Sequence, residues 1–298
     1  MRKLQRICVG TNFTPESDLA LATAVTLARA TGAGIDLVHA VHRPPLYERM
    51  MQSEQTLVAD LERHATSRLE QIAGAPAFAG VPIATHVRVG APFAELVNII
   101  RDLRHDLVVV GARKRSGLSE LLLGSTAERV LRKASVPVLL AKEPFADPPQ
   151  CILAPTDFSE ASRPALEEAI ALARRWQARL ILLHVIEPIV QAYAWASDLA
   201  GGEIYVIEPE ELQPEWDALI ATLDLSGVQW TSRTVKGDVA TSVAAAAQEA
   251  PADLVVVGTH GRTGLAHALL GSVAEGVARA VPRSVLAVRT GAEPFAMP

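Results

Sequence analysis

Asp253-Leu254-Val255-Val256-Val257-Gly258-Thr259-His260-Gly261 is the stretch of sequence that decides the fold, and nine residues after it come Gly271 and Ser272. Four consecutive apolar residues before a glycine predict a strand buried on both faces, as in a parallel sheet. Glycines let backbone N–H groups approach an anion closely, and a helix start adds unpaired N–H groups and the positive end of its dipole. The pattern therefore predicts a strand, an anion-binding loop and a helix, in that order.

An incomplete copy of the same pattern lies near the middle of the chain. Asp106-Leu107-Val108-Val109-Val110-Gly111-Ala112-Arg113-Lys114 is followed after nine residues by Gly124 and Ser125. Lys114 stands where the later copy has Gly261. One copy has the complete glycine pattern and the other does not.

The rest of the chain repeats with the same spacing. Thr11-Asn12-Phe13-Thr14 matches Thr156-Asp157-Phe158-Ser159 at a distance of 145 residues, and Gly111 matches Gly258 at 147. A nearly constant offset indicates a duplicated domain. We predict domains at residues 1–143 and 150–290, joined by a stiff linker at 142–150 that contains three prolines.

Strand and helix patterns alternate within each copy. Polar caps predict the first helices at Thr14-Pro15-Glu16 and at Ser159-Glu160. The predicted strands are 7–10, 35–41, 83–89, 107–110 and 136–140, then 152–155, 180–186, 228–235, 254–257 and 284–288. Short apolar strands alternating with helices predict an α/β fold with two doubly wound parallel-sheet domains. The last strand of each copy is apolar and is expected to form a sheet edge that invites pairing with another chain.

A ligand in such a fold binds beyond the carboxyl ends of the strands. Asp157 follows the first strand of the second copy, and Gly258 follows the fourth, so we expect both at one crevice with Gly261, Gly271 and Ser272. The alternatives are a turn aspartate, chain-turning glycines, and a capping box formed by Ser272 with Glu275. Ser125 and Glu128 have the same spacing in the first copy.

The first copy departs from the pattern at two positions. Asn12 replaces Asp157, and Lys114 brings a cation and a bulky side chain into the loop. With Gly111, Gly124 and Ser125 retained, we predict a degenerate site that binds nucleotide weakly or holds only an anion.

Composition excludes several classes of function. The 298 residues are 49% hydrophobic and carry a net charge of −5, which gives no electrostatic footprint for nucleic acid or a membrane. No apolar run approaches the length of a membrane span. Cys8 and Cys151 are expected to be core residues in a reducing compartment. No nucleophile paired with a base and no zinc-type spacing is seen, so we assign no catalytic residue and no metal ligand. His39 and His184 are expected to be hydrogen-bonded residues at strand ends.

Taken together, these motifs resemble the tandem universal stress proteins over nearly the full chain. The main match is Gly-x2-Gly-x9-Gly-Ser/Thr, formed by Gly258, Gly261, Gly271 and Ser272. The resemblance implies an adenine nucleotide alpha hydrolase-like fold with a five-stranded sheet in each domain. It also implies that ATP, with or without Mg²⁺, is held by these residues with Asp157 at the ribose or adenine and the backbone of Val185 facing adenine. Arg262 and Thr263 lie in the same loop.

The resemblance implies an ATP-binding stress-response regulator rather than an efficient enzyme. A weak ATPase and an interaction module without nucleotide remain the alternatives. A cytoplasmic homodimer with an unknown regulatory protein partner is expected from the family likeness and the apolar edge strands.

Overall fold

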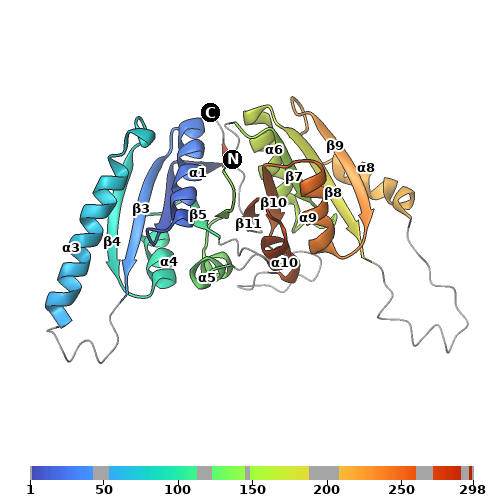
Figure 1. Ribbon diagram of the computed structural model, residues 1–298. Coiled ribbons are helices and arrows are strands. Elements are labelled where there is room, and N and C mark those ends of the chain that lie inside the picture. The colour runs from blue at the N-terminus through green and yellow to red at the C-terminus, as the bar shows by residue number, and fades with distance from the viewer. Residues whose placement is uncertain are drawn as a thin grey trace, which may run out of the picture.

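One continuous sheet runs through the whole molecule (Figure 1). The computed structural model describes residues 2–42, 54–112, 123–144, 148–187, 208–259, 271–289 and 295–296. Within these residues ten strands form the large sheet, five from each half, in the order β4-β3-β2-β5-β6-β11-β10-β7-β8-β9. The strands are parallel within each half, as predicted.

The two halves contain corresponding elements. The first has β2 (Arg6–Thr11), α1 (Pro15–Thr31), β3 (Gly34–Val41), α3 (Glu54–Ala73), β4 (Ile83–Val89), α4 (Pro92–Asp102), β5 (Leu107–Gly111), α5 (Ser125–Lys133) and β6 (Val138–Ala141). The second has β7 (Cys151–Pro155), α6 (Arg163–Trp176), β8 (Arg179–Ile186), the 3₁₀ turn η3 (Pro209–Leu212), α8 (Gln213–Ile220), β9 (Trp230–Lys236), α9 (Val239–Glu249), β10 (Leu254–Gly258), α10 (Ser272–Ala280) and β11 (Ser284–Val288).

The halves join edge to edge through their last strands. β6 and β11 pair antiparallel, with Leu139 opposite Leu286 and Leu140 opposite Val285. From the sequence, these apolar strands are expected to form sheet edges that pair with a second chain. The structure corrects that expectation, because the two strands form their hydrogen bonds with each other within one chain. An unpaired edge strand can associate with another chain, and the pairing of β6 with β11 removes two such edges.

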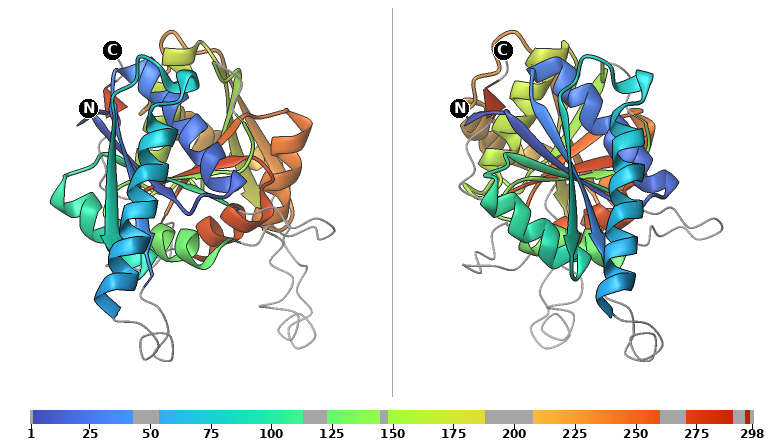
Figure 2. Two further views of the ribbon diagram at one scale, coloured as in Figure 1. Left: turned by 60° about the vertical axis from the view of Figure 1, so that its left-hand side comes forward. Right: turned by 90° about the vertical axis from the view of Figure 1, so that its left-hand side faces the viewer.

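Helices cover both faces of the sheet, and each face has its own core. On one face α1, α3, α6 and α8 pack over residues such as Leu37 and Leu182, and on the other α4, α5, α9 and α10 pack over residues such as Val108 and Val255. Both cores run through both halves. The view along the sheet shows the strands fanning about a common centre between the two helical layers (Figure 2). Cys8 and Cys151 are buried free thiols, as predicted, and burial raises the pKa of Cys8 well above its usual range.

An ion-pair network links the helices that meet at the centre of Figure 1. Arg132 of α5 donates to both oxygens of Glu275 on α10, at 2.9 and 2.8 Å, and Arg279 of α10 lies 3.1 Å from Glu128 of α5. The four residues are two equivalent pairs, so the contacts follow the internal symmetry. Burial opposes ionisation of Glu275, but hydrogen bonds from Arg279 and Arg132 outweigh it and lower its pKa.

The buried carboxylate of Asp36 distinguishes β3 from its counterpart β8. Asp36 lies 2.6 Å from His86 Nε2 and 3.0 Å from His105 Nε2, and it accepts two hydrogen bonds from Arg6. Burial opposes its ionisation, but hydrogen bonds from His105, His86 and Arg6 hold the pKa of Asp36 well below its usual range. Ile181 occupies the equivalent position in the second half, 145 residues later.

Two details differ from the sequence prediction. Helix α6 begins at Arg163 rather than at Ser159-Glu160, because Ser159 is held in a turn by Asp157 and Pro164 favours a start just before it. The chain ends also meet: β1 (Arg2–Lys3) pairs in parallel with β12 (Phe295–Ala296), beyond the predicted end of the second domain at residue 290.

Candidate nucleotide site

The turn after the first strand has the same strained conformation in both halves. Phe13 and Phe158 have φ angles of 62° and 63°, a region that side chains other than glycine rarely adopt. Each turn is held by the preceding threonine, because the phenylalanine N–H donates to the hydroxyl of Thr11 or Thr156 at 3.1 and 3.0 Å. Strain held in place twice at the carboxyl end of a strand is typical of a functional site.

This turn places the residue between the threonine and the phenylalanine at the crevice. In the second half it is Asp157, half-buried, whose Oδ1 accepts hydrogen bonds from the backbone N–H and the hydroxyl of Ser159. In the first half it is Asn12, whose Oδ1 accepts from the hydroxyl of Thr14 at 2.8 Å. Both side chains stabilise their turn, so the predicted turn role is present alongside any ligand role.

The histidines at the ends of the second strands are hydrogen-bonded boundary residues, as expected. His39 Nδ1 lies 2.9 Å from the carbonyl of Thr11, and His184 Nδ1 lies 2.8 Å from that of Thr156. Each ring also lies against the strained phenylalanine, with centroids 4.3 Å apart. Burial lowers the pKa of His39, although its hydrogen bond to Thr11 opposes this.

The helices α5 and α10 start on glycine and have no side-chain cap. Gly124 and Gly271 are the N-cap residues, so Ser125 and Ser272 are the first helical residues. The capping-box alternative is therefore wrong in both halves, and the glutamates that it required form the ion-pair network instead. Helix starts without a side-chain cap keep N–H groups for other partners such as an anion.

Gly111 and Gly124, the two pattern glycines of the first half, differ in whether the structure requires a glycine. A Cβ on Gly111 would collide with the backbone carbonyl of Glu16, so this glycine is required by the packing of α1. Gly124 has an ordinary φ of −60°, and a Cβ there would meet nothing within 4 Å. Packing and backbone conformation do not require glycine at 124, which is consistent with space kept for a ligand.

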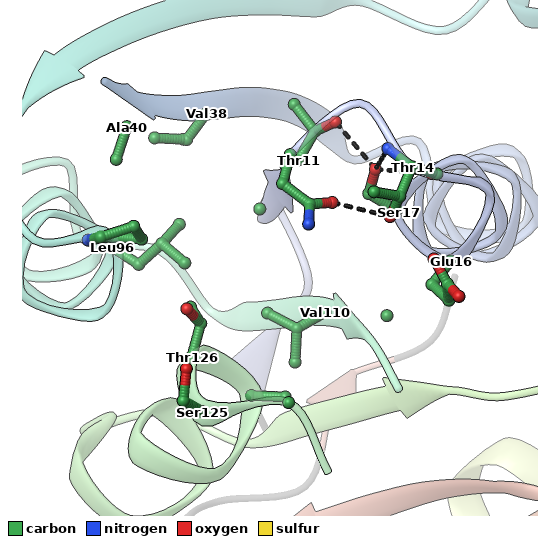
Figure 3. A pocket seen from close by; sticks show the side chains of 16 residues that line it. Thr11, Thr14, Glu16, Ser17, Val38, Ala40, Leu96, Val110, Ser125 and Thr126 are labelled. Atoms are coloured by element: carbon green, nitrogen blue, oxygen red, sulfur yellow. Dashed lines mark hydrogen bonds between the residues drawn. The ribbon is translucent and has the colours of Figure 1, made fainter. Parts of the chain in front are cut away.

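A cavity of about 350 Å³ lies at the crevice of the first half (Figure 3). The turn residues Thr11, Thr14 and Ser17 form one side, and Ser125 and Thr126 at the start of α5 form another. The rest of the lining comes from strand ends and the neighbouring helices: Gly10, Asn12, Glu16, Val38, Ala40, Pro92, Leu96, Val110, Gly111, Gly124 and Ala127. The volume lies within the range of small-molecule pockets.

This cavity collects the counterparts of the predicted second-half residues. Asn12, Ala40, Gly111, Gly124 and Ser125 correspond to Asp157, Val185, Gly258, Gly271 and Ser272. Residues from separate parts of the sequence thus converge at one crevice in the first half. Lys114, the predicted obstruction, lies outside the described residues.

In the second half the described residues have the same framework. β7 and β10 are adjacent parallel strands, so Asp157 and Gly258 follow neighbouring carboxyl ends. The N–H of Gly271 donates to the carbonyl of Thr259 at 2.8 Å, which brings the start of α10 to the end of β10. Val185 lies near the end of β8, in register with Val235. Gly261, Arg262 and Thr263 lie outside the described residues.

Two further observations concern other types of site. In the described parts of the chain, no three His, Cys, Asp or Glu side chains are grouped as metal ligands would be. Among the helices that the structure describes, none is both long and apolar enough to cross a bilayer.

Two doubly wound domains with glycine-capped helices at the carboxyl edge define a tandem α/β protein. The sequence model of the family described as "Universal stress protein family" matches residues 3–142 and again residues 150–289. The chain belongs to the universal stress protein family.

Two relatives agree with this membership, and a solved structure agrees with the fold. A universal stress protein of Mycolicibacterium smegmatis is 31% identical over 95% of this chain and 96% of its own length. Universal stress protein Mb2028c of Mycobacterium bovis is 28% identical over 97% of this chain and 98% of its own length. A universal stress protein from Archaeoglobus fulgidus matches the fold with a TM-score of 0.72 and 20% identity, covering 96% of this chain and 98% of the other.

Proposed function

We propose that this protein is an ATP-binding regulator of the stress response and that its second domain holds the nucleotide. The observation that carries the proposal is the start of α10. Gly271 leaves this helix without a side-chain cap, and its N–H donates to Thr259 at the end of β10, the strand that leads into the glycine loop. β10 lies beside β7, the strand that leads to the turn of Asp157. Backbone N–H groups and a carboxylate at one crevice match the phosphates and the ribose hydroxyls of a nucleotide.

Asp157 and the complete glycine loop favour the second domain over the first. A carboxylate accepts hydrogen bonds from ribose hydroxyls or an adenine amine more strongly than the amide of Asn12 does. Gly258, Gly261, Gly271 and Ser272 would bind the phosphates, with Arg262 and Thr263 supplying further contacts and the backbone of Val185 facing adenine. In the first domain, Lys114 would occupy part of the anion site, so its cavity would bind nucleotide more weakly or hold an anion alone.

The proposal assigns regulation rather than catalysis to the bound nucleotide. ATP, with or without Mg²⁺, would change which surface is offered to a regulatory protein partner in the cytoplasm. A homodimer remains part of the proposal on family likeness alone, because the edge strands that first suggested it pair with each other.

Two measurements on the purified full-length protein test this function. Mass spectrometry of ligand released by denaturation is expected to show adenine nucleotide, and absence of nucleotide together with no binding of added ATP would favour an interaction module. An ATP turnover assay is expected to show at most slow hydrolysis. Fast turnover that Asp157→Ala abolishes would instead identify an ATPase.

A further inference from the structure

A second hollow lies on the opposite face of the sheet from the nucleotide crevice. We call it the Phe13 hollow. It has a volume of about 310 Å³, and its lining is Phe13, His39, Val41, His42, Leu61, His64 and Ala65. The helix that walls it is α3, which packs against β3 and β4 at the left edge of Figure 1. The nucleotide site uses none of this lining.

At the equivalent position of the second half, larger side chains stand on α8, the helix that corresponds to α3. α3 and α8 end at Ala73 and Ile220, and the next strands begin at Ile83 and Trp230, so both ends differ by 147 residues. In this register Leu212 stands where the first half has Ala65, and Trp216 where it has Leu69. The indole of Trp216 is buried and packs edge-on against Phe158, with centroids 4.9 Å apart.

The internal comparison identifies the chemistry that suits this place. In the second half the strained phenylalanine is covered by an aromatic ring, whose N–H donates to Thr234 at 2.9 Å. The first half has Val87 at the position of Thr234, and its side chain offers no hydroxyl acceptor there. A ring that enters the hollow must therefore keep its polar group toward the rim, since an unpaired buried polar group is costly.

The rim of the Phe13 hollow carries donors and a cation. The guanidinium of Arg68 lies 4.5 Å from the centre of the Phe13 ring. His42 and His64 are exposed at the rim and supply further N–H donors, whereas the second half has Glu187 and Glu211 at these positions. The rim thus carries hydrogen-bond donors in the first half, where the second half has carboxylates. Only the rim of the first half favours a ligand with a carboxylate.

We propose that the Phe13 hollow binds a small planar aromatic carboxylate, with its ring against Phe13 and Ala65 and its carboxylate toward Arg68, His42 and His64. The contribution of such a ring comes from apolar burial and edge or face contact with the phenylalanine. The carboxylate adds a charge-assisted hydrogen bond to the guanidinium, which fixes the orientation.

Titration of the full-length protein with indole-3-carboxylate tests this site by calorimetry and by NMR of the histidine imidazoles. Saturable binding is expected with Kd of about 1 mM or tighter, with shifts at His39 and His64. Ala65→Leu installs the side chain that the second half has and is expected to weaken binding at least about tenfold through lost space. Arg68→Gln is expected to weaken indole-3-carboxylate about tenfold while changing the affinity for neutral indole less than about twofold.

Matched controls make each outcome decisive. Leu212→Ala changes the equivalent position of the second half and is expected to leave the affinity for indole-3-carboxylate unchanged. His64→Ala alters only an exposed residue, so it tests the rim if Ala65→Leu fails to fold. No saturable binding by the unmodified protein would overturn the proposal, as would binding that neither Ala65→Leu nor His64→Ala weakens. ATP affinity is expected to be the same in all these variants, which separates this site from the nucleotide site.

Discussion

Lys142 and Arg289 stand 147 residues apart in the sequence, and each binds the carbonyl end of the last helix of the other half. Lys142 Nζ donates to the carbonyls of Ala278 and Val281, at the carboxyl end of α10, at 2.7 and 2.5 Å. Arg289 donates to the carbonyl of Arg132 in α5 at 2.9 Å. Cations at the carboxyl ends of helices are favourable with respect to the helix dipole. The duplication has therefore produced a reciprocal pair of helix contacts that hold the halves together.

Burial of Lys142 predicts an unusual dependence of stability on pH. Burial lowers the pKa of Lys142 from 10.5 to about 7, against the opposing effect of Glu143. Below pH 7 the lysine is charged in both the folded and the unfolded states, so the full burial cost applies. Between pH 7 and pH 10 the unfolded state binds more protons, so stability rises with pH.

Urea unfolding of the unmodified protein and Lys142→Met between pH 7 and pH 9 measures this effect. Relative to the variant, the unmodified protein is expected to gain roughly 2 kcal/mol over this range. The comparison removes groups that titrate equally in both proteins. Parallel stability curves would show that Lys142 keeps an ordinary pKa in the folded state.

The two glycines of the first half should respond differently to alanine. Gly111→Ala is expected to cost about 1–3 kcal/mol of unfolding free energy, because the new Cβ collides with the backbone of Glu16. Gly124→Ala is expected to change stability by less than about 0.5 kcal/mol, because the Cβ projects into open space. Urea denaturation of both variants gives the comparison. Equal costs would mean that Gly124 also has a packing role.

The buried Asp36 should be important for stability. Asp36→Asn is expected to cost about 3 kcal/mol, because Arg6 and the two histidines lose their carboxylate. The folded-state pKa is depressed, so the contribution is present above the unfolded pKa of about 3.8. It is lost as the pH falls below that value.

Thermal unfolding at pH 7 and at pH 3 measures the Asp36 contribution. The difference between the unmodified protein and Asp36→Asn is expected to shrink at the lower pH. Asp60→Asn, an exposed acid on α3, is the control and is expected to leave the Tm unchanged. A full Asp36→Asn effect at pH 3 would contradict the assigned pKa direction.

The inner strands were predictable from sequence because burial on both faces leaves continuous apolar runs. All ten strands of the large sheet overlap their predicted ranges, and the predicted helix start at Thr14-Pro15 is confirmed. The offset of the repeats also predicted equivalent turns at Asn12 and Asp157. Family membership, inferred from the glycine pattern, is confirmed.

Features that depend on contacts between distant residues could not be predicted. Nothing local in β6 or β11 specifies that they pair antiparallel, and Arg132 and Glu275 are 143 residues apart. The spacing of Ser272 and Glu275 favoured a capping box, but the tertiary contact of Glu275 with Arg132 prevailed. The Phe13 hollow is lined by the small side chain of Ala65 on α3, and only the structure shows this space.

Calorimetric titration with ATP measures directly whether the second domain holds the nucleotide. The exchange variants Asp157→Asn and Asn12→Asp give each half the residue of the other. We predict about one strong site per chain, an affinity at least about tenfold lower in Asp157→Asn, and no loss in Asn12→Asp. Two sites of equal affinity in the unmodified protein, or undiminished binding by Asp157→Asn, would contradict this prediction.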